Sequence, residues 1–301
     1  MSLKKRLAIL TRPLRRALAG GNPIVERRAM IARRPQEAQT YFLLGPDLAL
    51  KRLNAGPALY VDPQDEQISA SIILTGSWEP WVSAVVLSLL KPGDRAVEVG
   101  ANVGYYTALM AARVGPEGFV TSLEANARLV RLIDRTVRVN GFVDRTRLIA
   151  KAAMDAPGTI DFVSFRNYSG GGHVPLILDA AYGEEHGEPE RYQVEAVRLD
   201  DLDCGRVDFL RIDAEGSEPF ILRGAKALLR VNPDIVICME WSRVQIGPRV
   251  SLTEFLDWLE GLGFRFWLIG PPTGLTPLSR EALMDTLHCD IILSRREPRV
   301  S

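Results

Sequence analysis

The stretch that decides the fold reads Val97-Glu98-Val99-Gly100-Ala101-Asn102-Val103-Gly104-Tyr105-Tyr106-Thr107. It predicts a buried strand over residues 95–99, a glycine turn, and a helix over 103–114. Glycines at such a turn let the backbone approach a ligand closely, and the free N–H groups at the start of the helix point toward that ligand. We therefore expect a ligand to lie against this turn.

The spacing within the turn indicates which class of ligand it holds. A dinucleotide-binding turn has the pattern Gly-x-Gly-x-x-Gly. Here Asn102 stands at the second glycine, and Gly104 falls one place too early for the third. This argues against a pyrophosphate, and so against an NAD-dependent oxidoreductase, and it favours a smaller nucleoside. The spacing acid-x-Gly-x-x-x-Gly, which begins at Glu98, is how many methyltransferases hold S-adenosylmethionine.

An acid beyond the turn supports a nucleoside ligand. The predicted second strand, residues 118–124, ends in Glu124. A carboxylate about 20 residues past a glycine turn is the expected acceptor for ribose hydroxyls. The alternative is an ordinary tight strand-to-helix turn, with a surface acid capping the helix that begins at Asn126.

Composition and charge limit the possible partners. The chain has 301 residues with 37 basic and 37 acidic side chains, so its net charge is zero, and no overall positive field attracts nucleic acid. It has three cysteines without a Cys-x-x-Cys pair. It also has no apolar run near the ~20 residues of a membrane span. These features predict a reduced, cytoplasmic protein.

The N-terminal segment differs from the rest in charge. Residues 4–34 hold ten Lys or Arg against one acid, Glu26. We expect residues 1–75 to form a basic, mostly helical extension before a main domain over 76–301. The extension is either a solvated arm, packed on the domain or on the second subunit of a homodimer, or a weak contact to an anionic membrane surface or substrate.

Strands and helices alternate from residue 95 onward, which predicts an α/β fold with a mainly parallel sheet covered on both faces. Strands at 159–165 and 192–199 interrupt this rhythm and flank a Gly-rich, polar excursion. Residues 59–63 and 72–75 read as short strands or lead-in loops, and a Pro/Gly-rich loop joins the last two strands. The seven strands predicted for the sheet are 95–99, 118–124, 146–151, 207–213, 234–240, 264–269 and 287–293.

Acids follow the apolar strands at five successive strand ends. In an open parallel sheet the ligand lies beyond the carboxyl ends of the strands. Acids near a helix start also stabilise that helix, so part of this pattern is structural. A sulfonium nucleoside would use them further, because its ribose hydroxyls and ammonium group are donors and its sulfur is positive. The acids are Glu98, Glu124, Asp155, Asp213 with Glu215, and Glu240.

The order of these motifs resembles that of the FkbM family of S-adenosylmethionine-dependent O-methyltransferases, over roughly residues 75–245. Where that family often has Asp, Lys and Pro, this chain has Glu98, Arg211 and Ala125. The resemblance implies a Rossmann-like class I methyltransferase with an antiparallel last strand and no metal. The motifs are Val97 to Thr107, Ser122 to Asn126, Ala152 to Gly158, Leu199 to Leu202, Phe209 to Glu218, and Gly76-Ser77-Trp78-Glu79.

A cofactor site follows from these motifs. Glu124 would accept the ribose hydroxyls, Asp155 would lie near the adenine amine, and Glu79, Glu98 or Asp213 would take the ammonium group. The residues predicted to bind S-adenosylmethionine are Glu79, Glu98, Gly100, Ala101, Asn102, Gly104, Tyr105, Thr107, Glu124, Ala125, Asn126, Ala153, Asp155 and Asp213.

A base for the methyl acceptor has four candidates. His173, at the end of the Gly-rich stretch 167–173, has an unperturbed pKa of about 6.5, which suits a base at neutral pH. Asp213, Glu215 and Glu240 are the others, and Glu215 could equally accept bonds from loop amides. The same acids are of the type that holds Mg²⁺, but no motif requires a metal.

Three functions remain open from the sequence. The first is an O-methyltransferase that acts on a hydroxyl of a small molecule, natural product or saccharide. The second is a nucleic-acid methyltransferase, which the neutral charge and the missing Asn/Asp-Pro-Pro-aromatic motif disfavour. The third is a non-catalytic protein that retains the fold. Acceptor choice would lie in 1–75, 166–191 and 270–286, where the pattern is least recognisable.

Overall fold

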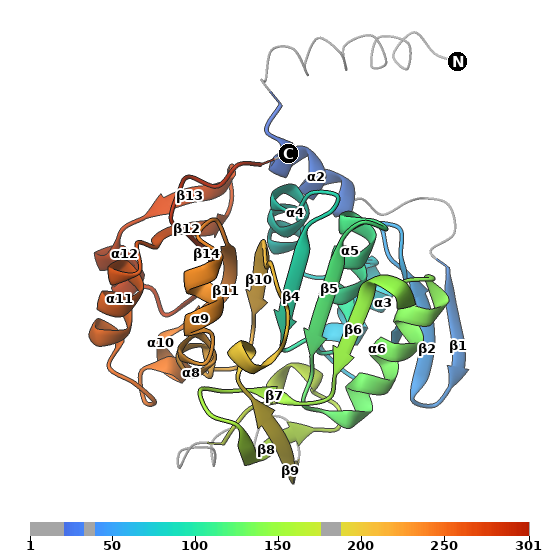
Figure 1. Cartoon of the computed structure of the whole chain (residues 1–301). Helices are drawn as coiled ribbons and strands as arrows, with labels where there is room; N and C mark the ends of the chain where they lie inside the picture. Colours follow the sequence, from blue (N-terminus) through green and yellow to red (C-terminus); the bar gives the residue numbers. More distant parts are fainter. Residues whose placement is uncertain (1–20, 33–39, 176–187, 301) are drawn as a thin grey trace, which may run out of the picture.

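The structure, a computed structural model, describes residues 21–32, 40–175 and 188–300. The strands of its main sheet are β4 (Arg95–Val99), β5 (Phe119–Leu123), β6 (Thr146–Ile149), β10 (Phe209–Ile212), β11 (Val236–Ser242), β12 (Arg265–Gly270), β13 (Gly274–Leu278) and β14 (His288–Ser294). Within the described ranges their order is β13-β12-β14-β11-β10-β4-β5-β6 (Figure 1). The strands β4, β5, β6, β10 and β11 run parallel, whereas β14 is antiparallel to β11.

This arrangement confirms the predicted α/β fold, with its mainly parallel sheet and antiparallel last strand. The seven predicted strands are all present, and β13 adds an eighth at the edge, within the segment predicted as a loop. Pro277 lies in β13 opposite Trp267. Proline is tolerated on an edge strand because its missing N–H is not needed for a second ladder. The Pro/Gly-rich composition of this segment therefore led to a prediction of loop where the structure has the edge strand β13.

Helices cover both faces of the sheet. Alternate strand residues pack on opposite sides, so Ala96 and Phe209 share one core with α4 and α5, whereas Val97 and Leu210 share another with α8, α9 and α11. This is the period-two pattern of strands buried on both faces. The helices are α4 (Pro80–Leu89), α5 (Tyr105–Val114), α6 (Ala127–Val139), α8 (Glu218–Arg223), α9 (Lys226–Val231), α10 (Arg243–Ile246), α11 (Leu252–Gly261) and α12 (Arg280–Asp285).

The N-terminal part is not mostly helical where the structure describes it. After α2 (Pro23–Ile31) come β1 (Tyr41–Gly45), β2 (Leu48–Arg52) and β3 (Ala58–Val61), which form an antiparallel sheet. The prediction of helix was wrong for β1 and β2, because β2 alternates more and less buried residues and pairs on both sides. The strand β3 overlaps residues 59–63, which were predicted as a short strand or lead-in loop. The remaining basic residues, in 1–20 and 33–39, lie outside the described residues.

Residues 72–75 also differ from their prediction. They belong to α3 (Ile68–Thr75), which buries Ile68 and Ile72 and ends at Gly76 in the left-handed conformation. A short apolar run cannot be assigned to strand or helix by periodicity alone. Here the spacing of four between the two buried isoleucines, together with the glycine C-cap, made it a helix.

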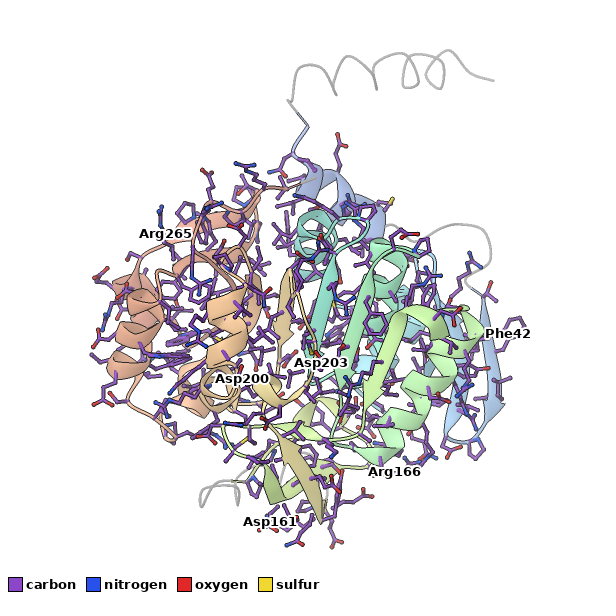
Figure 2. The ribbon with its side chains drawn as sticks, in the orientation of Figure 1. Phe42, Asp161, Arg166, Asp200, Asp203 and Arg265 are labelled. Carbon is purple, nitrogen blue, oxygen red and sulfur yellow. The ribbon has the colours of Figure 1, made fainter. Side chains whose placement is uncertain are left out.

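The N-terminal elements pack against the main domain. The amide of Tyr60 in β3 donates to Thr136 Oγ1 on α6 over 2.9 Å, and Arg27 Nε on α2 donates to Ser88 Oγ on α4 over 3.1 Å. The strand β1 lies at the outer edge, where Phe42 is exposed (Figure 2). Among the described residues no one helix has the length and apolarity to cross a bilayer; α3 and α4 reach them together, with a bend of 82° between them.

A second, smaller sheet lies at the carboxyl ends of the parallel strands, below the main sheet in Figure 1. It consists of β7 (Ala152–Ala153), β9 (Pro189–Val197) and β8 (Gly158–Phe165), in that order. The last two match the strands predicted at 192–199 and 159–165. The short 3₁₀ helices η1 (Val143–Arg145), η2 (Ser169–Gly171) and η4 (Leu199–Asp201) complete the described elements.

Candidate functional site

A cavity of about 440 Å³ opens where the parallel strands end and the small sheet begins. A ligand is expected at this edge of an open parallel sheet, and the volume suits a small-molecule cofactor. Most of the predicted site residues line it. They are Glu79, Gly100, Ala101, Asn102, Tyr105, Glu124, Ala125, Asn126, Ala153, His173, Asp213, Glu215 and Glu240.

The glycine turn is shaped by close contact with the next strand. Gly100 has φ +80°, and a Cβ placed there would lie 1.8 Å from the carbonyl oxygen of Asp213. Asn102 is also left-handed, with φ 51°, and its N–H donates to Glu124 Oε2 over 2.7 Å. A side chain at position 100 would therefore collide with the end of β10, and the turn, residues 100–103, forms a backbone cradle along the edge of the cavity.

Glu124 is held rigidly at the end of β5. Besides the bond from Asn102, its Oε1 accepts the N–H of Asn126 over 2.8 Å at the start of α6. Burial raises the pKa of Glu124 to about 7, against the bonds from Asn126 and Asn102, which lower it. A carboxylate oxygen has two acceptor sites, so each oxygen retains capacity for a ligand hydroxyl. This geometry suits the role predicted for Glu124.

A buried arginine organises the acids on the other side of the turn. Arg211 on β10 is 4% exposed, and its Nη2 lies 2.8 Å from Asp213 Oδ2 and 3.8 Å from Glu79 Oε2. Its guanidinium lies 3.8 Å from the ring centroid of Tyr106, whose hydroxyl donates to Glu79. Burial, followed by the charge of Asp290, raises the pKa of Glu79 to about 7.

Three carboxylates converge beside this arginine. One oxygen each from Asp213, Glu215 and Glu240 lie within 4.8 Å of one another. Burial, then the charge of Asp213, raises the pKa of Glu215 to about 8 and that of Glu240 well above its usual range. Glu215 has φ 50° and accepts a bond from Gln245. Such a donor set could hold a divalent cation, so the expectation that no metal is needed stays a prediction.

Residues with a strained, left-handed backbone lie around this cavity. The non-glycine residues with positive φ in the described part of the chain are Glu79, Asn102 and Glu215, and all three line it. A left-handed non-glycine residue costs free energy and persists only where the surrounding structure imposes it. The concentration of such residues around one cavity marks it as the functional site.

His173 lies in the wall formed by the Gly-rich stretch. Its backbone pairs with Val163 of β8, and its ring Nδ1 lies 2.8 Å from the carbonyl oxygen of Gly171. The side chain is 5% exposed and faces Phe165 with nearly parallel rings. His173 is therefore an ordered, buried residue of the cavity rather than a surface loop residue.

Four predicted cofactor residues lie away from the cavity. Glu98 is fully buried in the sheet and accepts bonds from Thr107 and Ser122, so it satisfies those hydroxyls instead of a ligand. Gly104 packs against Ile133, where a Cβ would come within 3.0 Å. Asp155 is exposed, because the chain turns outward between β7 and β8. None of these four residues, Glu98, Gly104, Thr107 and Asp155, lines the cavity.

Several lining residues were missed as site residues, among them Arg211, Tyr106 and His288. Arg211 drew notice only as a departure from a family pattern, and Tyr106 only as part of a helix. His288 begins β14, with its Nδ1 3.6 Å from Glu240 Oε1. A signal existed for His288, since an antiparallel last strand begins at the edge where the parallel strands end.

The sequence model of the methyltransferase FkbM domain matches residues 98–266, more than half of the chain. The chain belongs to the FkbM methyltransferase family. The family-wide match includes the glycine turn, Glu124 and the Asp213 to Glu218 motif, and it ends before β13.

Individual relatives of this FkbM-family protein match over shorter stretches. A protein-L-isoaspartate O-methyltransferase of Ignicoccus hospitalis is 34% identical over 68 residues, 23% of this chain and 32% of that protein. A demethylmenaquinone methyltransferase of Symbiobacterium thermophilum is 30% identical over 87 residues, 29% of this chain and 35% of that protein. The chain thus spans about a third of the length of these curated relatives.

Solved structures of methyltransferases resemble this chain at low identity. An FkbM methyltransferase from Methylobacillus flagellatus has a TM-score of 0.45 and 14% identity, covering 74% of this chain and 52% of that one. A SAM-dependent O-methyltransferase from Thermotoga maritima has a TM-score of 0.40 and 19% identity, covering 84% and 80%.

The buried acids make stability depend on pH in an unusual direction. A folded-state pKa above the unfolded value of about 4.5 means that the folded protein binds more protons between the two values, so stability falls as pH rises through that window. We expect the ligand-free protein to melt several degrees higher at pH 6 than at pH 8, by calorimetry at constant ionic strength. Burial raises the pKa of Asp290 to about 6, the pKa of Glu79, Glu124 and Glu218 to about 7, and the pKa of Glu215 to about 8.

A variant isolates one of these groups. Glu215→Gln cannot titrate, so its melting temperature should change less between pH 6 and pH 8 than that of the wild type. A melting temperature that rises from pH 6 to pH 8 in the wild type would contradict the burial of these acids.

Proposed function

We propose that the protein transfers a methyl group from S-adenosylmethionine to a hydroxyl oxygen of a small molecule or saccharide. The observation that carries the proposal is the buried carboxylate of Glu124, bonded to the amide of Asn102 beside the Gly100 cradle. It stands at the position where a nucleoside ribose is held in this fold. Membership of the FkbM methyltransferase family supports it.

The residues of the cavity fit this cofactor. When bound, S-adenosylmethionine supplies a methyl group on a positively charged sulfonium. Glu124 would accept its ribose hydroxyls, and the backbone of residues 100–103 lines the cavity where it would lie. Glu79 and Asp213, which share Arg211, would accept bonds from the ammonium group. The acids as a group favour a cationic ligand, because opposite charge stabilises buried carboxylates.

The acceptor hydroxyl would meet the three-carboxylate cluster. Glu240 is the best-placed base, because its Oε2 is buried and accepts no hydrogen bond from the described residues. Burial, followed by the charges of Asp213 and Glu215, raises the pKa of Glu240 well above its usual range, which makes its carboxylate a stronger base than an ordinary glutamate. His288, 3.6 Å from the other oxygen of Glu240, would orient this carboxylate and is open to solvent for the release of the proton.

The test begins with cofactor binding. We expect titration calorimetry to show micromolar binding of S-adenosylhomocysteine and no binding of NAD⁺, because the cradle lacks the dinucleotide glycines. Radiolabelled S-adenosylmethionine would then be supplied with saccharides, small hydroxylated compounds and structured RNA, and the methylated position identified by mass spectrometry. Absence of S-adenosylhomocysteine binding overturns the enzyme hypothesis, and label on RNA alone favours a nucleic-acid methyltransferase.

A further inference from the structure

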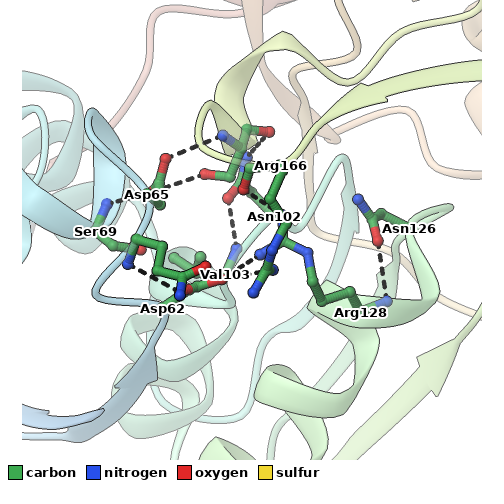
Figure 3. Close-up of polar contacts among 10 residues, drawn as sticks. Asp62, Asp65, Ser69, Asn102, Val103, Asn126, Arg128 and Arg166 are labelled. Carbon is green, nitrogen blue, oxygen red and sulfur yellow. Dashed lines mark hydrogen bonds and ion pairs between the residues drawn. The ribbon is translucent and has the colours of Figure 1, made fainter. Parts of the chain in front are cut away.

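One wall of the cavity is held from outside the family domain. This wall, residues 166–174, contributes Tyr168, Ser169 and His173 to the lining. It lies against residues 62–69, which we call the anchor loop and which run into the first turn of α3 (Figure 3). The anchor loop precedes the family domain, residues 98–266. Gln67 and Ile68 of the anchor loop also line the cavity.

Asp65 is the centre of this contact. It is fully buried, and its Oδ1 accepts the N–H of Ser169 over 3.0 Å. Its Oδ2 accepts the hydroxyl of Ser169 over 3.0 Å and the N–H of Ser69 over 2.6 Å. Three donors therefore converge on one carboxylate, which fixes both the backbone and the side chain of Ser169.

Neighbouring contacts hold the same two segments together. Asp62, 2% exposed, binds Arg166 Nη1 over 3.0 Å and Arg128 Nη1 over 2.5 Å, which joins the anchor loop to the wall and to α6. The N–H of Glu66 donates to the carbonyl oxygen of Asn167 over 2.8 Å. At Gly170 an added Cβ would come within 2.7 Å of Gln67 Oε1.

Ser169 passes this constraint to the glycine turn. Its carbonyl oxygen accepts a bond from Asn102 Nδ2 over 2.9 Å, and the N–H of Asn102 donates to Glu124 Oε2. A continuous chain of hydrogen bonds thus runs from Asp65 through Ser169 and Asn102 to Glu124. Asn102 needs such support because its φ of 51° is costly for a non-glycine residue.

We infer that Asp65 is a positioning residue for the cofactor: through Ser169 it holds Asn102, and so the amide that orients Glu124. The inference rests on the proposed cofactor, and it assigns part of the site to a loop outside the family domain. Asp65 touches no ligand in this scheme. It acts by keeping the wall and the glycine turn in register before a ligand binds, which lowers the ordering cost of binding.

A double-mutant cycle tests the linkage. Asp65→Asn is isosteric but presents an amide where three donors converge, and we expect S-adenosylhomocysteine to bind about tenfold more weakly by calorimetry. Asn102→Gly keeps the left-handed turn and removes the bond to Ser169, with a similar expected loss. The double variant should bind no more weakly than either single variant, because both cut the same chain. Asp203→Asn, at an exposed position outside the cavity, is the control.

Hydrogen exchange gives a second readout that needs no ligand. Asp65→Asn should speed amide exchange in residues 100–104 of the free protein, whereas Asp203→Asn should not. Ser169→Ala, which removes only the hydroxyl, replaces Asp65→Asn if the latter does not fold, with an expected loss of about threefold in affinity. Unchanged exchange at 100–104, affinity within twofold of wild type, or multiplicative effects in the cycle each overturn the inference. A wild type that binds no S-adenosylhomocysteine overturns the proposed function instead, and the exchange comparison still decides the role of Asp65.

Discussion

Replacing Glu124 with alanine is expected to raise the dissociation constant of S-adenosylhomocysteine roughly 100-fold or more. At pH 8, above the pKa of about 7 for Glu124, two ribose hydroxyls would lose an ionised acceptor. A hydrogen bond to a charged group is worth about 1.5–3 kcal/mol. The N–H groups of Asn102 and Asn126 would also lose their acceptor, so the turn would lose its fixed geometry. Titration calorimetry of the wild type and the variant measures the change.

Two controls separate lost binding from lost folding. Glu124→Gln keeps one carbonyl oxygen for one of the two amides, so it should bind S-adenosylhomocysteine better than Glu124→Ala but worse than the wild type. Asp203→Ala removes an exposed acid outside the cavity and should leave affinity unchanged. Circular dichroism confirms that each variant is folded. Affinity of Glu124→Ala within threefold of the wild type would place the ribose elsewhere.

The position of Glu124 at the cavity shows what strand position can predict. The carboxyl ends of parallel strands must meet at one edge, so an acid at the end of the second strand had to lie near the glycine turn of the first. The same reasoning placed Asp213 and Glu240 correctly in the cavity. Strand direction carries this information, and the alternation of strands and helices predicts it.

Side-chain direction was harder to predict. Glu98 precedes the glycine turn by two residues, yet strand alternation points its side chain to the face of the sheet that α5 covers. There it lies beside Ser122 and accepts a bond from Thr107 of α5. Asp155 follows a strand end, but the chain turns outward there, which depends on how β8 pairs with β9. Contacts across long sequence separations, such as Asp65 with Ser169, leave no local pattern at all. Local periodicity cannot report such contacts.

Replacing Gly100 with alanine is expected to destabilise the folded protein by roughly 2–5 kcal/mol. Two costs add: a left-handed residue with a Cβ costs about 1–2 kcal/mol, and an overpacked contact costs about 1–3 kcal/mol. The contact here is with backbone, the carbonyl oxygen of Asp213 at 1.8 Å, so no side chain can rotate away to relieve it. Urea unfolding of the two proteins measures the difference in the free energy of unfolding.

Gly93→Ala is the matched control for this experiment. Gly93 has φ +85°, close to the +80° of Gly100, but an added Cβ there meets no atom within 4 Å. It should therefore show only the backbone cost, about 1–2 kcal/mol, and retain cofactor binding. The excess cost of Gly100→Ala over Gly93→Ala then measures how tightly the turn and the end of β10 are pressed together. Equal losses in the free energy of unfolding for the two variants would mean that the end of β10 moves away from an added Cβ at no cost. The contact between Gly100 and the carbonyl oxygen of Asp213 would then not constrain the turn.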